Sequence, residues 1–496
     1  MIRDKEMANK EQQIKNSFIY LMPFISGVVL SFLTLPLFTR ILTREDYGVL
    51  ALANIYAIFV SGLANFGMTI AYDRNYFQYR SSSIETAKLL YSSLLFVILN
   101  FLFFAGLTFV FRGTLSKFII GSAEHANILF WAVCAQFFSG ISYYYLAYFK
   151  NSESAKKFVG YKITGSFIAI VLSLYLVAYL RIGVIGMVYA QVCSGILVFA
   201  ILTYKFINIF PVIFSKTIFV ESLKISYPLT PRIFFGVIGS QFDKYMIGLL
   251  ATVGGVGIYS ISQKVAFSGF NYMTALQNVY APQVYKRMFD LGDKGGAAVG
   301  RYLTPFAYMS IFVTLMIALF SQEVITILTP SSYHGAIDIV TVLSMLYGSY
   351  FFGKQPQLIF AKKTWLTSAL TLMSIVLNIG INIPFIMKWG AIGAAWATLL
   401  AGIISSSISF IIAQHYYEIK WEYKKIGAIF FIFFASAISM ILMRHFMIDY
   451  PIRLIIKLIF MSSYIYVGMK IRVITLENFN LVKKLFSFKC TLFQRN

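Results

Sequence analysis

The chain has 496 residues, of which 59% are hydrophobic and 12% are charged, and its mean hydropathy is +0.75. This composition excludes an ordinary soluble globular protein. The 42 Lys and Arg residues against 19 Asp and Glu give a net charge of +23. These basic residues lie in short segments between apolar runs, so membrane topology accounts for them and no nucleic-acid partner is expected.

A membrane-spanning helix needs about 20 mainly apolar residues, and fourteen stretches of this chain are predicted to be such spans. In chain order they are residues 17–39, 48–72, 89–111, 127–149, 161–180, 184–204, 226–249, 253–274, 303–320, 337–350, 365–387, 391–414, 426–443 and 451–469. The predicted fold class is therefore an all-α polytopic membrane protein with about fourteen transmembrane helices.

The distribution of basic residues predicts the orientation of these spans. The N-terminal segment, every second loop and the C-terminal tail together contain 29 Lys and Arg, whereas the intervening loops contain 7. Segments on the cytoplasmic side carry the excess of Lys and Arg. Both termini are therefore predicted to be cytoplasmic.

Several short motifs occur twice, in the same order. The sequence GVIG at 183–186 recurs as GAIG at 390–393, and Gly48 with its surroundings recurs at Gly257. Collinear matches of this kind predict a duplicated unit of about 200 residues. Each copy contains six spans and so begins on the cytoplasmic side, which predicts two parallel repeats related by an axis along the membrane normal. The small residues are expected to let neighbouring helices approach closely.

This organisation divides the chain into five predicted segments: a cytoplasmic N-terminal segment, two six-helix bundles, an extra helix pair and a basic cytoplasmic tail. Their bounds are 1–16, 17–207, 208–415, 416–469 and 470–496.

The segments between spans argue against an enzyme. The longest outer loop, 321–336, has about sixteen residues, and the longest inner loop, 275–302, has about twenty-eight. Neither is long enough for a catalytic domain, and no Gly-Lys-Ser/Thr phosphate-binding loop or His-rich metal motif occurs. The three cysteines lack zinc-site or disulfide spacing. No cofactor and no metal site are expected.

Residues 36–48 (PLFTRILTREDYG), the pairs Asp73-Arg74 and Asp243-Lys244, and residues 256–260 (VGIYS) form a further pattern. This pattern resembles the polysaccharide transporter family, which comprises O-antigen and capsule flippases of the multidrug/oligosaccharidyl-lipid/polysaccharide (MOP) superfamily. The resemblance extends over the first twelve predicted spans.

The resemblance implies two six-helix bundles around a central cavity that works by alternating access. The implied cargo is an undecaprenyl-diphosphate-linked oligosaccharide, moved from the inner to the outer leaflet of a bacterial cytoplasmic membrane. Membrane lipid and other polysaccharide-assembly proteins are further expected partners. Coupling to an ion, H⁺ or Na⁺, is implied for at least some members.

Charged residues within predicted spans are candidates for the site, because a charge in the bilayer usually faces a cavity or a partner. Arg232 and Lys264 are predicted to line the cavity and bind the diphosphate or acidic sugars. Arg232 is also close enough to its span end to snorkel to the headgroups. Asp243 lies at a depth that allows an ion pair with Lys264, which would act as a gate or take part in ion coupling, or serve packing alone.

Other charges lie at span ends. Arg40, Asp73, Arg74 and Lys244 are predicted at the cavity mouth or the membrane interface, with interface anchoring favoured. Lys457 is predicted to snorkel from the last span to the headgroups.

The second span carries a polar stripe of Asn54, Ser61 and Asn65. Hydrogen bonding between helices and contact with sugar explain this stripe equally well.

Two other classes of function stay open. One is a cation or drug antiporter, or a peptidoglycan-precursor flippase, of the same superfamily. The other is a non-transport membrane component of polysaccharide assembly. The positive net charge within the spans favours an anionic cargo over a cationic one.

Overall fold

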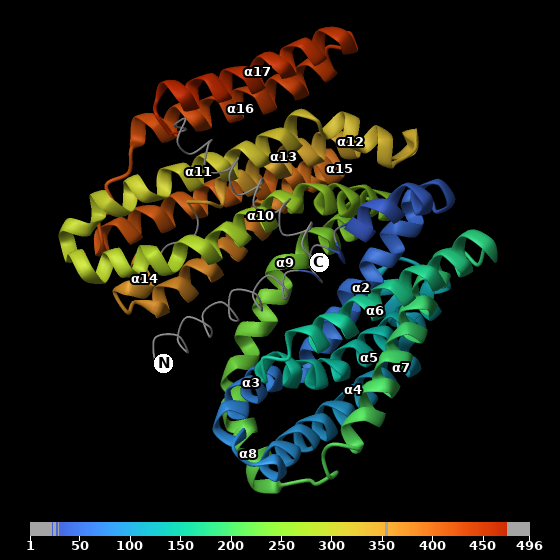
Figure 1. The fold of residues 1–496 in the computed structure, drawn as a ribbon. Coiled ribbons are helices and arrows are strands. Elements are labelled where there is room, and N and C mark those ends of the chain that lie inside the picture. Colours follow the sequence, from blue (N-terminus) through green and yellow to red (C-terminus); the bar gives the residue numbers. More distant parts are fainter. Residues whose placement is uncertain (1–21, 23–25, 28, 353–355, 474–496) are drawn as a thin grey trace, which may run out of the picture. The chain divides into compact units, whose positions relative to one another are not determined.

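The computed structural model describes residues 22, 26–27, 29–352 and 356–473 (Figure 1). Among the residues it describes there is no strand, which confirms the all-α prediction. Two compact units are present. The first contains the described residues up to Ser260 together with Ile327–Tyr333, and the second contains Ile261–Thr326 and the described residues from His334 onward.

The first unit is built from long helices that run side by side, with shorter helices at their ends (Figure 1). After an apolar helix at Val29–Ile41, its helices are α2 (Arg44–Asn65), α3 (Met68–Tyr79), α4 (Ser83–Ile119), α5 (Ala126–Asn151), α6 (Ala155–Ser173) with its continuation η2 (Leu174–Tyr179), α7 (Val184–Ile207), α8 (Lys216–Ser226), α9 (Thr230–Leu250) and the start of α10 (Val253–Leu291).

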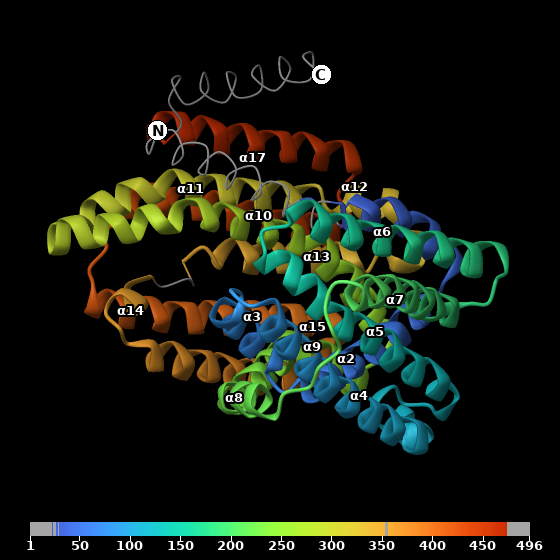
Figure 2. The same ribbon diagram turned by 60° about the horizontal axis from the view of Figure 1, so that its bottom comes forward.

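The second unit continues α10 and adds a second set of long helices, among which α11, α16 and α17 lie side by side (Figure 2). These helices are α11 (Gly295–Leu319), α12 (Ser321–Leu328), α13 (Ala336–Ser349), α14 (Pro356–Phe360), α15 (Thr364–Tyr416), α16 (Tyr423–His445) and α17 (Tyr450–Lys470).

Nine helices in the described part are long and apolar enough to cross a membrane, so the chain is a multi-pass membrane protein. One of them, α15, covers the two predicted spans 365–387 and 391–414. Between these spans Gly390 has the non-helical angles φ 61° and ψ −137°, which kink α15 at this point. The helices α9 and α10 match two further predicted spans, but their polar residues place them outside the nine. The count of fourteen and the cytoplasmic placement of the termini stay predictions.

The predicted segment bounds also stay predictions. Residues 1–16 and 474–496 lie outside the described residues, as does most of the first half of the span predicted at 17–39. The predicted boundary at 207/208 separates sequence repeats, whereas the two compact units separate within α10.

Two predicted boundaries are wrong. The span predicted at 48–72 is interrupted by Phe66 and Gly67, which have φ 52° and 74° and end α2. The inner loop predicted at 275–302 is almost entirely helical, since α10 runs to Leu291 and α11 begins at Gly295. Hydropathy marks where a helix leaves the apolar layer, whereas the backbone hydrogen bonds of a helix continue through polar residues.

Two local features shape helices that line the pocket described below: a capping box at the start of α2 and a π-helical turn at the end of α6. Thr43 and Asp46 form a capping box at the start of α2, where the Thr43 hydroxyl accepts from the Asp46 backbone N–H at 3.1 Å and the Asp46 carboxylate accepts from the Thr43 N–H at 2.9 Å. In α6 the regular helix gives way to the π-helical turn η2, in which the Leu180 N–H donates to the Tyr175 carbonyl at 2.9 Å.

The repeated glycines make equivalent contacts in the two units. Gly195 of α7 packs on α5, and Gly402 of α15 packs on α13. A Cβ atom at Gly195 would lie 2.9 Å from the Phe138 Cβ, and one at Gly402 would lie 2.4 Å from Leu346 Cδ1. In each repeat, therefore, the sixth predicted span packs on the fourth through the equivalent glycine, as duplication predicts.

A second pair of equivalent glycines brings the starts of α2 and α10 into contact within the first unit. A Cβ atom at Gly48 would lie 1.9 Å from the Val253 carbonyl oxygen, and one at Gly257 would lie 1.9 Å from the Arg44 carbonyl oxygen. Arg44 and Val253 also occupy equivalent positions of the repeat. The contact is reciprocal, which is the pattern expected around a two-fold axis.

We expect Gly48→Ala to lower the free energy of unfolding by about 1–3 kcal/mol, because the new methyl group would overlap the Val253 carbonyl. The matched control is Gly62→Ala in the same helix, where a Cβ would meet nothing within 4 Å. This control should be stabilised by about 0.5–1 kcal/mol, since alanine favours a helix. Thermal unfolding in detergent measures both changes, and equal stability of the two variants would contradict the close crossing.

Candidate functional site

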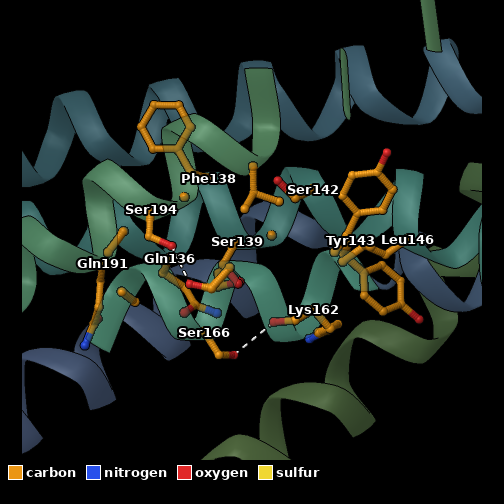
Figure 3. Close-up of a pocket in the computed structure, with 18 of the residues that line it drawn as sticks. Gln136, Phe138, Ser139, Ser142, Tyr143, Leu146, Lys162, Ser166, Gln191 and Ser194 are labelled. Carbon is orange, nitrogen blue, oxygen red and sulfur yellow. Dashed lines mark hydrogen bonds between the residues drawn. The ribbon is translucent and has the colours of Figure 1, made fainter. Parts of the chain in front are cut away.

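A pocket of 460 Å³ lies within the first unit, among helices α2, α5, α6 and α7, all of which are candidate spans (Figure 3). Its walls carry many amides and hydroxyls for a site at membrane depth. The polar residues that matter most below are Asn54, Ser61 and Asn65 of α2, Gln136 and Ser139 of α5, and Gln191 of α7.

Part of this polar lining is held by hydrogen bonds within the protein. The Asn65 side-chain oxygen accepts from the Thr69 backbone N–H at 3.1 Å and from the Tyr144 hydroxyl at 3.2 Å. The Ser194 hydroxyl donates to the Gly165 carbonyl at 2.7 Å, which joins α7 to α6 (Figure 3). These bonds fix the walls of the pocket.

The rest of the lining has no such bonds. Among the described residues, Asn54, Ser61, Gln136, Ser139 and Gln191 have no hydrogen-bond partner. The polar stripe predicted on α2 is therefore divided: Asn65 bonds to neighbouring protein groups, whereas Asn54 and Ser61 face the pocket.

The pocket is electrostatically almost neutral. Of the side chains that line it, only Lys162 is charged at neutral pH, and this residue is exposed at the rim. No carboxylate belongs to the lining, and no group of three metal-ligating side chains occurs in the part of the chain that the structure describes. Such a lining suits neutral hydrogen-bonding groups and offers no negative charge to a bound cation.

Sequence reasoning missed the contribution of α5 and α7 to this pocket. Gln136, Ser139 and Tyr143 follow one another at spacings of three and four, so they share one face of α5. Gln191 and Ser194 do the same on α7. A search for polar residues at helical spacing inside apolar runs would have found both sets.

The two predicted cavity cations lie on α9 and α10. The side chain of Arg232 lies outside the described residues, although its backbone belongs to α9. Lys264 is exposed on α10 and forms no hydrogen bond or ion pair with another described residue. Their roles as ligands of the cargo stay predictions.

Asp243 and Lys244, near the end of α9, take different local partners. Asp243 accepts a hydrogen bond from the Tyr259 hydroxyl at 3.1 Å, and Lys244 donates to the Gln241 side-chain oxygen at 3.1 Å. Asp243 belongs to the first unit and Lys264 to the second. The ion pair between them stays a prediction.

Asp73 forms a network at the end of α5. Its carboxylate accepts from Lys150 at 2.8 Å, from the Asn151 amide at 2.8 Å and from the Tyr143 hydroxyl at 3.2 Å. Because Tyr143 also lines the pocket, this network positions one wall of it. Asp73 therefore supports the pocket through Tyr143, while its predicted place at the mouth or interface stays a prediction.

Arg74 contacts a different set of residues from Asp73, and it links α3 to α8. Its guanidinium donates to Asn75 at 2.7 Å and to Gln78 at 2.9 Å, and it lies 3.6 Å from Glu221. Tyr79 also donates to Glu221, and burial together with this carboxylate raises the pKa of Tyr79 to about 12. Arg40, by contrast, is exposed at the end of the helix Val29–Ile41.

The prediction that Lys457 snorkels to the headgroups is wrong. Lys457 is 0% exposed, and its ammonium lies 2.5 Å from the Glu323 carboxylate. Glu323 belongs to α12, inside the segment predicted to be an outer loop. Arg444 adds a second link, since its Nε donates to Asp338 at 2.8 Å. These pairs tie the last two helices to α12 and α13.

Comparison with known proteins identifies a family to which the chain belongs. A family model described as "Polysaccharide biosynthesis protein" matches residues 37–338, which is more than half of the chain. The probable low-salt glycan biosynthesis flippase Agl15 of Haloferax volcanii is 24% identical over 197 residues. That match spans 39% of this chain and 41% of the relative, so it covers less than half of either protein.

Solved membrane transporters share the fold. The lipid II flippase MurJ in its inward closed conformation has a TM-score of 0.68 at 17% identity, covering 93% of this chain and 100% of that one. An inward-facing multidrug resistance MATE family transporter of the MOP superfamily has a TM-score of 0.64 at 14% identity, covering 81% and 97%. These likenesses confirm the predicted transporter-like fold.

We expect Glu323→Gln to destabilise the protein by about 3–5 kcal/mol, because it leaves the Lys457 charge buried without its partner. The double variant Glu323→Gln/Lys457→Met should recover most of this loss, since it removes both charges. As a control, Glu85→Gln breaks a half-exposed pair with Lys88 and should cost no more than about 1 kcal/mol. Thermal unfolding in detergent compares the variants, and a double variant less stable than Glu323→Gln would contradict the expectation.

Proposed function

Because the chain belongs to the family of polysaccharide biosynthesis proteins, we propose that it is a flippase for a lipid-linked oligosaccharide. The family match over more than half of the chain carries this proposal. The transporter-like fold and the printed description of the Haloferax volcanii relative as a probable glycan biosynthesis flippase support it.

The proposed cargo is an undecaprenyl-diphosphate-linked repeat unit of an O-antigen, capsule or related surface polysaccharide. The protein would carry it from the inner to the outer leaflet of a bacterial cytoplasmic membrane by alternating access, acting as a transporter and not as an enzyme. Coupling to H⁺ or Na⁺ and association with other polysaccharide-assembly proteins belong to the same proposal.

Arg232 and Lys264 are the residues we propose to hold the diphosphate. A diphosphate that enters a low-dielectric cavity needs fixed cations, and a guanidinium binds phosphate oxygens with two parallel hydrogen bonds. Lys264 has no protein partner among the described residues, so its ammonium is available to an anionic ligand. Asp243 is proposed to act in gating or ion coupling. Arg40 and Lys244 are proposed to lie at the mouth or interface, with Asp73 and Arg74.

Two other functions are distinguishable from this one. A drug or cation antiporter needs acidic groups to bind its cargo, and the pocket lining contains none. A peptidoglycan-precursor flippase would carry a different lipid-linked cargo. Loss of such a flippase would arrest cell-wall synthesis, whereas loss of the proposed one would stop the export of surface polysaccharide. A non-transport assembly component would not move lipid-linked units between the leaflets of reconstituted vesicles.

Deletion of the gene tests the proposal directly. In the deletion strain, lipid-linked repeat units should accumulate on the inner leaflet and surface polysaccharide should disappear. Purified protein in proteoliposomes should move the extracted lipid-linked oligosaccharide between leaflets. Normal surface polysaccharide in a deletion strain without a second flippase gene would refute the proposal.

We expect Arg232→Ala and Lys264→Ala each to lower transport at least tenfold while protein abundance stays normal, because each removes a proposed ligand of the diphosphate. The matched control is Lys294→Ala, which removes an exposed cation from the turn between α10 and α11. Transport of the lipid-linked oligosaccharide in proteoliposomes is the measurement. Full transport by both cavity variants would eliminate this site assignment.

A further inference from the structure

The pocket of the first unit lies far from the ends of the helices that line it. Asn54 is ten residues from the start of α2 and Ser139 thirteen residues from the start of α5. At about 1.5 Å per residue these positions are about 15 and 20 Å from the helix starts, whereas the apolar layer of a membrane is about 30 Å thick. The amides and hydroxyls of the pocket are therefore at a depth where the surroundings are apolar.

Polar groups at this depth are costly unless they are paired or face a polar occupant. Asn54, Gln136 and Gln191 each carry a donor and an acceptor, and none of them bonds to another described residue. Ser142 adds a buried hydroxyl without a partner in the described part. So many unpaired groups around one cavity indicate that the pocket holds something with hydrogen-bonding groups of its own.

The chemistry of the lining identifies the class of occupant. A cation is disfavoured, because no carboxylate lines the pocket and Lys162 lies at its rim. A lipid tail is disfavoured by the amides. Neutral sugars fit, since each sugar hydroxyl donates and accepts, as do the amides of asparagine and glutamine. The rings of Phe138 and Tyr161 line the same pocket and offer apolar surface to the C–H faces of a sugar ring.

The size of the pocket agrees with this occupant. Its 460 Å³ lies within the range of about 300–1,000 Å³ that is usual for small-molecule pockets. It has room for part of an oligosaccharide and not for a lipid-linked molecule as a whole. Tyr143 closes one wall and is held by Asp73, so Asp73 is a positioning residue for the pocket.

We propose that this pocket, formed by Asn54, Ser61, Gln136, Ser139 and Gln191, binds neutral sugar residues of the cargo. The inference rests on the proposed flippase function and deepens it: cations elsewhere hold the diphosphate, while the first unit binds the uncharged part of the glycan. The pocket then contributes to the choice among glycans, because a sugar that leaves its amides unpaired binds more weakly.

The test uses the deletion strain and its own lipid-linked glycan, so no sugar has to be guessed. Asn54→Leu/Gln136→Leu removes two amides and places apolar side chains in an apolar layer. If the pocket holds only water, this change should leave export normal. If the pocket binds sugar, surface polysaccharide should fall at least tenfold and lipid-linked units should accumulate, with protein abundance and Tm unchanged. Asn208→Leu, an exposed amide at the end of α7, is the matched control.

A second measurement does not depend on the folding of the double variant. A small photo-reactive diazirine amino acid replaces Ala169, which lines the pocket without a polar group, or Val110, which is 72% exposed on α4. After illumination of the cells, mass spectrometry should find the glycan on the peptide that contains position 169 and not on the peptide that contains position 110.

The outcomes separate the two proposals. If wild-type protein restores export but Asn54→Leu/Gln136→Leu does so equally well, the pocket does not bind cargo and the flippase function stands. The absence of a glycan adduct at position 169 in a transport-active variant would overturn the inference in the same way. If wild-type protein does not restore export, the flippase function fails and this inference fails with it.

Discussion

The constraint on which this structure depends is the lack of water in the apolar layer of a membrane. A polar group in a spanning helix must bond to another protein group, reach the headgroups or face an aqueous or ligand-filled space. Lys457 bonds to another protein group, Glu323, and Asp73 bonds to Lys150 and Asn151. Asn54, Gln136 and Gln191 have no such bond within the described residues and face the pocket. This contrast with the paired charges distinguishes a candidate site from a structural support.

Duplication supplies the frame on which these groups are placed. The reciprocal contact between Gly48 and Val253, and between Gly257 and Arg44, places equivalent positions of the two repeats against each other. Gly195 and Gly402 repeat a second contact inside each unit. The glycines are alike in both copies, but the polar groups are not: Ile55 occupies the place of Lys264, and the last two helices have no counterpart in the repeat. A shared backbone plan thus carries different chemistry in its two halves.

The helices could be predicted from the sequence because hydropathy is a local property. The predicted spans 127–149 and 184–204 match α5 and α7 within a few residues. Helix continuation beyond the apolar layer was not predictable from hydropathy, so α10 was drawn too short. The Lys457–Glu323 pair joins residues 134 positions apart, and one sequence does not reveal such pairing. The stripe on α2 was visible in the sequence, but only the structure separates bonded Asn65 from unbonded Asn54.

The π-helical turn at Leu174–Tyr179 gives α6 two differently directed faces. Before it, residues such as Tyr161 line the pocket; within it, Tyr175 and Tyr179 are exposed and their rings stack with centroids 5.5 Å apart. One extra residue in a turn rotates everything beyond it by about 100° around the helix axis. The length of this segment is therefore as informative as its composition: in a relative, loss or gain of a single residue here would redirect the chain that leads into α7, even if the rest of the sequence were identical.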